Sequence, residues 1–167
     1  NFDLEARVPL IIATPGQTES QRTTSLVELL DIYPPLAELC DLQAPDHLEG
    51  ESLVPVLESP ETSVKPATYT WHPRPAYPKP GSDPEVMGHS VRTDRYRYTE
   101  WRNYQTGAVQ ARELYDHQAD PQETINLAGN QEQQATVRRL SRLLHRKTVA
   151  AQEASLQPFL GDPQLEL

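Results

Sequence analysis

The sequence predicts an α/β chain whose C-terminal half is a small α+β subdomain, an antiparallel sheet with one long helix. Residues 7–14 form a short apolar run that ends at a Pro-Gly pair, typical of a strand buried on both faces of a sheet. Residues 87–92 and 95–102 favour two strands around a tight turn. From Gln131 onward, apolar residues recur on one face of a helix.

The first half continues with a helix. Ser25 and Glu28 have the spacing of a capping box, which predicts a helix over residues 26–32. The pair Pro34-Pro35 breaks or restarts this helix. Cys40 follows at the end of an apolar stripe, so we expect a buried thiol.

The second half alternates strands with loops. Residues 64–72 are rich in strand-forming side chains, and residues 113–116 suggest a short further strand. Residues 73–81 contain alternating prolines, which push their neighbours to extended geometry and predict a stiff exposed loop. A loose tail is expected around residues 158–167.

The lone buried strand at residues 7–14 has no sheet partner among the elements predicted for this chain. A strand of this kind needs neighbours on both sides, so we expect its sheet partners to lie upstream of Asn1. Residues 1–63 are accordingly predicted to end a large α/β domain, and residues 64–167 to form the C-terminal α+β subdomain.

Charge argues against nucleic acid as a partner. The 167 residues have a net charge of −9, and residues 1–91 hold 5 Lys or Arg against 14 Asp or Glu. An alternative remains, because arginines and aromatics interleave as in a single-strand binding platform. Strand alternation instead predicts a hairpin with its tyrosines under the C-terminal helix. The residues concerned are Arg92, Arg95, Arg97, Arg102, Tyr96, Tyr98, Trp101 and Tyr104.

Other classes of site are also disfavoured. No apolar run approaches the roughly 20 residues of a membrane-spanning helix, so no membrane contact is predicted. Cys40 is the single cysteine, which excludes disulfides within the chain and thiolate zinc sites.

Several segments, in order along the chain, resemble type I sulfatases. The matching runs are Val8-Pro9-Leu10-Ile11, residues 25–34, Glu113-Leu114-Tyr115-Asp116, Asp120-Pro121 and residues 123–128. Two further segments are similar to iduronate-2-sulfatase and its bacterial relatives: His72-Pro73-Arg74-Pro75 and residues 87–101. The resemblance covers about residues 1–145 and identifies the chain as the C-terminal part of such an enzyme.

The resemblance implies an alkaline-phosphatase-like fold and a chemistry that this segment does not itself supply. Sulfatases of this family use formylglycine, made from Cys or Ser, together with a cation that is usually calcium. Cys40 is followed by Asp41-Leu42-Gln43-Ala44 and lacks the family's Ser and Arg, and no paired-aspartate motif occurs. The sequence therefore offers no candidate catalytic or metal-binding residue. The implied partner is the N-terminal catalytic part, with Asn1 lying just after the last catalytic residue.

Three residues are candidates for substrate binding: His72, Arg74 and Lys79. Arg74 offers a rigid fork for a uronate carboxylate, and Lys79 offers a point charge from the proline-stiffened loop. The alternative is that Arg74 and Lys79 are solvated loop charges, or that Arg74 forms a structural ion pair. His72, beside a tryptophan, could equally be a packed or surface residue.

We therefore expect a sulfuric ester hydrolase acting on sugars, with 2-O-sulfated uronic acid as a candidate substrate. This segment would supply a pocket wall and specificity, and a periplasmic or extracellular location is the corresponding expectation. Two alternatives stay open. One is a non-catalytic sulfatase-like binding module, and the other is a different hydrolase of the alkaline-phosphatase superfamily.

Overall fold

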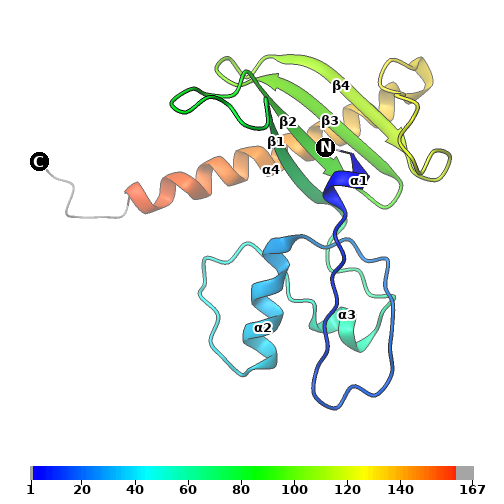
Figure 1. Ribbon diagram of the computed structural model, residues 1–167, viewed down its shortest axis with the longest axis vertical. Helices are drawn as coiled ribbons and strands as arrows, with labels where there is room; N and C mark the ends of the chain where they lie inside the picture. Colours follow the sequence, from blue (N-terminus) through cyan, green and yellow to red (C-terminus); the bar gives the residue numbers. More distant parts are fainter. Residues whose placement is uncertain (1, 161–167) are drawn as a thin grey trace, which may run out of the picture.

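A four-stranded antiparallel sheet and one long helix dominate the computed structural model, which describes the backbone of residues 2–160 and the side chains of residues 2–149 (Figure 1). The upper part contains β1 (Thr68–Arg74), β2 (Val86–Arg92), β3 (Tyr96–Asn103), β4 (Val109–Asp116), the 3₁₀ turn η2 (Gln131–Gln133) and α4 (Gln134–Leu160). The remainder contains α1 (Asp3–Ala6), η1 (Leu29–Ile32), α2 (Tyr33–Leu39) and α3 (Val54–Glu58).

The sheet is a simple meander with strand order β1-β2-β3-β4. The predicted tight turn joins β2 to β3, where the Thr93 N–H donates to the Tyr96 carbonyl at 2.8 Å. β1 extends through Pro73 and Arg74, which we had expected in the loop. It can do so because β1 is an edge strand, where a proline removes no ladder hydrogen bond on the open side. β4 begins at Val109, four residues earlier than predicted.

The main core lies between the sheet and α4. Val91 on β2, Tyr98 on β3 and Leu114 on β4 are fully buried, and Leu140 and Leu144 of α4 pack on them. Complete burial of each such side chain stabilises the fold by about 1.5–3 kcal/mol. The prediction that tyrosine packs under the C-terminal helix is confirmed at Tyr98.

The N-terminal residues cover the opposite face of the sheet, where Figure 1 shows α1 in front and α4 behind. Phe2 packs on Tyr115, with 5.7 Å between ring centroids. The Asp3 carboxylate accepts a hydrogen bond from Arg97 Nη2 at 2.9 Å, and Arg97 Nε donates to Glu123 at 2.7 Å. Arg97 is thus a buried ion-pair partner rather than part of a nucleic-acid platform.

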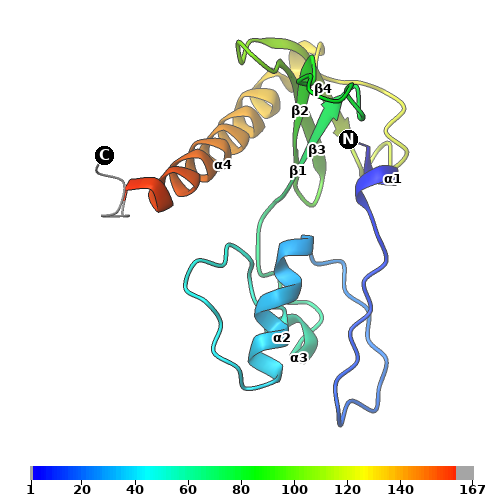
Figure 2. The same cartoon turned by 60° about the vertical axis from the view of Figure 1, so that its left-hand side comes forward.

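Residues 7–14 form no strand within the described part of the chain. The segment runs extended without strand pairing, and Ile11 is 91% exposed. A strand is defined by the neighbour that satisfies its backbone groups, and none of residues 2–160 pairs with this segment. Figure 2 shows it as a long extended stretch beside the lower helices.

The predicted helix at residues 26–32 is also displaced. The capping box is formed by Glu28 and Asp31, one turn later than the sequence pattern suggested, and it opens only the short η1. The α-helix starts at Tyr33 with prolines in its first turn, where their missing N–H groups need no partner. Cys40 is exposed, which corrects the expected buried thiol.

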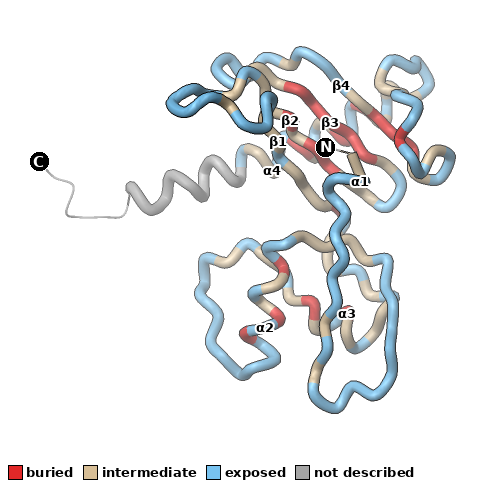
Figure 3. The backbone as a smooth tube through the Cα atoms, viewed as in Figure 1, coloured by how far each residue is buried: buried red, intermediate tan, exposed pale blue. Residues whose placement is uncertain are grey.

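Burial is concentrated in the sheet, as Figure 3 shows along β2, β3 and β4. The lower part has a small core of its own, which includes Ala37, Leu53 and Val56. Helix α4 continues to Leu160, past Pro158, where we had expected a loose tail. A proline so near a helix end removes only one intrahelical bond. Residues 161–167 of that expected tail lie outside the described residues.

Candidate functional site

Two of the three candidate residues share one face of the edge strand. His72 and Arg74 are two positions apart on β1, so both side chains point to the sheet face opposite α4. The Arg74 guanidinium carbon lies 3.8 Å from the centroid of the Trp101 ring. A cation over an aromatic face is worth about 0.5–2 kcal/mol, with the lower values at exposed sites such as this one. Arg74 on β1 thus stacks on a ring from β3, two strands away in the sheet.

Trp101 is itself fixed, so it gives Arg74 a rigid platform. Its ring is 5% exposed, and its Nε1–H donates to Glu113 Oε1 at 3.0 Å. Stacking uses the flat face of a guanidinium and leaves its N–H edge free to meet a carboxylate or sulfate. Arg74 remains exposed. The arrangement is therefore able to present a planar, oriented cation at the edge of the sheet.

Lys79 occupies a different position, in the loop that follows β1. Arg74 lies at the base of this loop, where its carbonyl accepts the Glu85 N–H at 3.0 Å. Lys79 is exposed farther along, and its carbonyl accepts both the backbone N–H and the hydroxyl of Ser82. The structure brings His72 and Arg74 onto one face but leaves Lys79 away from the stacked pair.

A buried polar cluster under α4 was missed by sequence reasoning. Glu100 on β3 is 1% exposed and accepts hydrogen bonds from Tyr98 Oη at 2.8 Å and Ser141 Oγ at 2.7 Å. Arg102 Nε donates to its other oxygen at 3.0 Å, and His145 Nε2 lies 3.6 Å from that oxygen. The sequence contained a pattern that predicts this cluster in part, because residues 98, 100 and 102 are two positions apart and therefore lie on the same face of a strand.

The electrostatics of this cluster are set by burial and hydrogen bonding. Burial alone would raise the pKa of Glu100, but hydrogen bonds from Ser141, Tyr98 and Arg102 outweigh it and hold that pKa below its ordinary value. Burial, followed by the neighbouring carboxylate, raises the pKa of the Tyr98 hydroxyl. With its partners satisfied, Glu100 is a structural anchor for α4 rather than a free acid or base.

The described part of the chain contains neither a cluster of metal-binding side chains nor the sulfatase nucleophile motif. No group of three or more His, Cys, Asp or Glu side chains within residues 2–149 could hold a metal ion. Cys40 lies in a segment without the sulfatase nucleophile motif. Among the described helices, none combines the length and apolar character needed to cross a membrane.

Comparison with known families agrees with the fold and the strand pattern. Residues 2–150 match the family model for N-sulphoglucosamine sulphohydrolase, C-terminal, and the chain belongs to this family of sulfatase C-terminal domains. The resemblance to type I sulfatases is thereby confirmed.

Individual relatives are sulfatases from animals and bacteria. A sulfatase of Formosa agariphila is 31% identical over 162 residues, covering 95% of this chain and 28% of the relative. Arylsulfatase K of Xenopus laevis is 28% identical over 129 residues, covering 77% and 24%. Iduronate 2-sulfatase of Mus musculus is 28% identical over 186 residues, covering 76% and 34%. The chain spans about a quarter to a third of the length of these relatives.

Solved structures confirm the predicted fold class. A putative sulfatase from Bacteroides thetaiotaomicron has a TM-score of 0.56 at 25% identity, over 77% of this chain and 25% of that chain. A protein solved with its substrate D-glucosamine-2-N,6-O-disulfate has a TM-score of 0.57 at 24% identity, over 82% and 25%. The sheet with its long C-terminal helix is thus the C-terminal subdomain of a sulfatase fold.

Proposed function

We propose that the intact protein hydrolyses sulfate esters of sugars and that its substrate carries a 2-O-sulfated uronic acid. This chain would supply one wall of the substrate pocket. The observation that supports this most directly is Arg74, an exposed guanidinium stacked on the buried Trp101 at 3.8 Å. Family membership and the similarity to iduronate 2-sulfatase give the reaction class.

Arg74 suits a carboxylate because its orientation is set before the substrate arrives. An arginine fork pairs with a carboxylate through two parallel hydrogen bonds, and stacking on Trp101 lowers the entropy lost on binding. His72, on the same face, is proposed as a neighbouring polar contact. Lys79 is proposed to add a point charge at the rim from its exposed loop.

The rest of the catalytic apparatus is proposed to belong to the N-terminal part of the same protein. That part would hold formylglycine and calcium, since the described residues contain no fitting set. Residues 1–63 would complete the large domain, and residues 64–167 would form the subdomain. Action outside the cytoplasm, in the periplasm or the extracellular space, is proposed from the same family relationship.

The test is a substrate comparison with variants of the intact protein. Arg74→Ala and Arg74→Lys are assayed on a disaccharide ending in 2-O-sulfated uronate and on the methyl ester of the same sugar. A charged hydrogen-bond pair is worth about 1.5–3 kcal/mol, so Arg74→Ala should raise KM for the uronate by about 10- to 150-fold. The ester should show a much smaller rise. Arg139→Ala, an exposed arginine on α4, serves as the matched control.

Four results would each overturn a part of the proposal. An equal KM change for the acid and the ester would mean that Arg74 does not read the carboxylate. A loss of stability with KM unchanged would mean that Arg74 only covers Trp101. If the intact protein turns over phosphate or phosphonate esters but no sulfate esters, it is another hydrolase of the superfamily. If it turns over none of them, the binding-module alternative is favoured.

A further inference from the structure

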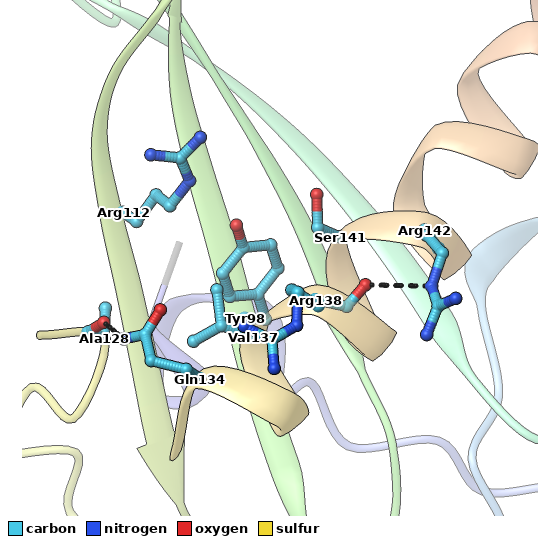
Figure 4. Close-up of a pocket in the computed structure, with 8 residues that line it drawn as sticks. All are labelled: Tyr98, Arg112, Ala128, Gln134, Val137, Arg138, Ser141 and Arg142. Carbon is cyan, nitrogen blue, oxygen red and sulfur yellow. Dashed lines mark hydrogen bonds between the residues drawn. The ribbon is translucent and has the colours of Figure 1, made fainter. Parts of the chain in front are cut away.

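A groove of about 650 Å³ lies between α4 and the sheet, on the face opposite Arg74. Figure 4 shows the residues that line the groove, with Arg112 on β4 at one side and a row of residues on α4 at the other. The residues that line it are Tyr98, Arg112, Ala128, Gln134, Val137, Arg138, Ser141 and Arg142. Three of the eight lining residues are thus arginines, one from β4 and two from α4.

These three arginines differ from Arg95, Arg97 and Arg102, which lie on or beside β3. Arg95, Arg97 and Arg102 each pair with a carboxylate, at Asp116, Glu123 and Glu100 respectively. Arg112, Arg138 and Arg142 are exposed, and no carboxylate among the described side chains pairs with them.

The local carboxylate does not neutralise these charges. Glu100 lies directly opposite Arg112 in the register of β3 and β4, but its carboxylate is already bound by Ser141, Tyr98 and Arg102. Among the described residues, the one hydrogen bond of an arginine side chain of the groove joins Arg142 Nε to the Arg138 carbonyl at 3.3 Å. The groove therefore has a local positive charge in a chain whose net charge is −9.

The positive charge continues along the helix in a regular row. Arg138, Arg142 and Arg146 are four residues apart on α4, and a second hollow is lined by Ser141, Arg142, His145 and Arg146. At 1.5 Å rise per residue, successive arginines are about 6 Å apart along the axis. A row of charges with this spacing suits a linear chain with repeated anionic groups rather than a single small anion.

We propose that this groove binds the anionic repeat of a sulfated, uronic-acid-containing glycan, away from the group that is hydrolysed. The choice of a glycan over other polyanions rests on the function proposed above. Each guanidinium can form paired hydrogen bonds with a sulfate or carboxylate. Gln134 donates its amide N–H groups to the Ala128 and Asn130 carbonyls, which leaves its amide oxygen available for a sugar hydroxyl.

The lining disfavours nucleic acid as the occupant. Single-stranded nucleic acid is held by stacking of bases on exposed aromatic rings. Tyr98 is the single aromatic residue of the groove lining, and it is fully buried. A polyanion also gains no long-range attraction from an acidic chain, so binding must come from short-range contacts and weaken as salt rises.

The experiment measures binding without turnover, by fluorescence anisotropy of a labelled heparin octasaccharide with the intact protein. The variant Arg112→Gln/Arg138→Gln/Arg142→Gln should raise Kd about tenfold or more and flatten the dependence of Kd on salt. Arg139→Gln on the same helix should leave Kd unchanged. All three exchanged positions are exposed, and circular dichroism of each variant verifies the fold.

Three outcomes would overturn the inference. The first is an unchanged Kd in the triple variant. The second is a loss of binding in Arg74→Ala instead, which would place the octasaccharide at the proposed pocket wall. The third is tighter binding of a labelled dT20 oligonucleotide through the same arginines, which would make nucleic acid the occupant. Because anisotropy needs no hydrolysis, an intact protein without sulfatase activity would still show whether the groove binds the glycan.

Discussion

Ser141 on α4 donates a hydrogen bond to the buried carboxylate of Glu100 on β3, with 2.7 Å between the two oxygens. This bond ties the long helix to the centre of the sheet, beside the apolar contacts of Leu140 and Leu144. Glu100 also accepts bonds from Tyr98 and Arg102, so one carboxylate joins two adjacent elements.

Glu100→Gln should weaken the docking of α4. The substitution removes the charge that compensates the largely buried Arg102, and losing one partner of a buried pair costs about 3–5 kcal/mol. We expect faster hydrogen exchange in residues 134–149 of the intact protein and a lower free energy of unfolding. Glu132→Gln, exposed on η2, is the matched control. Equal exchange in the two variants would show that the apolar contacts alone hold α4.

His89 should make this subdomain sensitive to mild acid. Burial, followed by Arg102 nearby, lowers the pKa of His89, while Glu100 acts in the opposite direction and His145 adds to the lowering. Its ring stacks on Trp71 at 5.4 Å, and its buried Nδ1 has no hydrogen-bond partner among the described residues. Protonation would therefore place an unpaired charge under the helix.

The direction in which stability changes with pH follows from the difference between the folded and unfolded pKa of His89. A histidine whose pKa is lowered by folding contributes stability that is present above its unfolded pKa of about 6.5 and is lost as pH falls through the folded pKa. Urea unfolding at pH 7.5 and at mildly acidic pH should show this loss in the native sequence and a smaller loss in His89→Gln. His47→Gln, at an exposed position, should keep the native pH dependence. If all three proteins lose the same unfolding free energy between the two pH values, other groups cause the acid sensitivity.

Gly50→Ala should destabilise the lower part of the chain. A Cβ atom at this position would lie 2.1 Å from the Leu30 carbonyl oxygen, and this backbone atom cannot move aside as a side chain could. Overpacking of this kind costs about 1–3 kcal/mol. Gly129→Ala is the control, because nothing lies within 4 Å of its Cβ position. Limited proteolysis within residues 28–58 should accelerate in Gly50→Ala only, and equal rates in both variants would contradict the prediction.

Lys65→Met should open the contact between η1 and the segment that leads into β1. Lys65 Nζ lies 2.6 Å from Asp31 Oδ1 and 2.9 Å from Glu28 Oε2. Asp31 is fully buried, so its charge would lose its cationic partner at a cost of about 3 kcal/mol or more. The double variant Lys65→Met/Asp31→Asn should recover part of the lost unfolding free energy. No recovery would mean that methionine itself does not fit the site.

Local patterns predicted the second half of the chain well. The turn at residues 93–94, the alternation that buries Tyr98 and the apolar face of α4 follow from periods of 2 and 3.6 residues. The first half was predicted poorly, because a capping box can form at either of two neighbouring positions. The structure selects Glu28, whose carboxylate also accepts the Tyr69 N–H at 2.7 Å.

The candidate site was predictable only in part. The motif around Arg74 singled out the residue, but its platform could not be read locally, because Trp101 reaches it across the sheet. The Glu100 cluster could not be predicted locally either, because Ser141 lies on α4 and meets Glu100 of β3 only in the folded chain.

The sequence by itself determined which segments are helix or strand in the sheet-and-helix half, because backbone period and side-chain polarity act over a few residues. Tertiary structure decided which polar groups are paired and which remain free. Arg97 and Arg112 are chemically alike, yet one meets a buried carboxylate and the other faces an open groove. That difference depends on which distant segments meet, and desolvation then sets the energetic value of each charge.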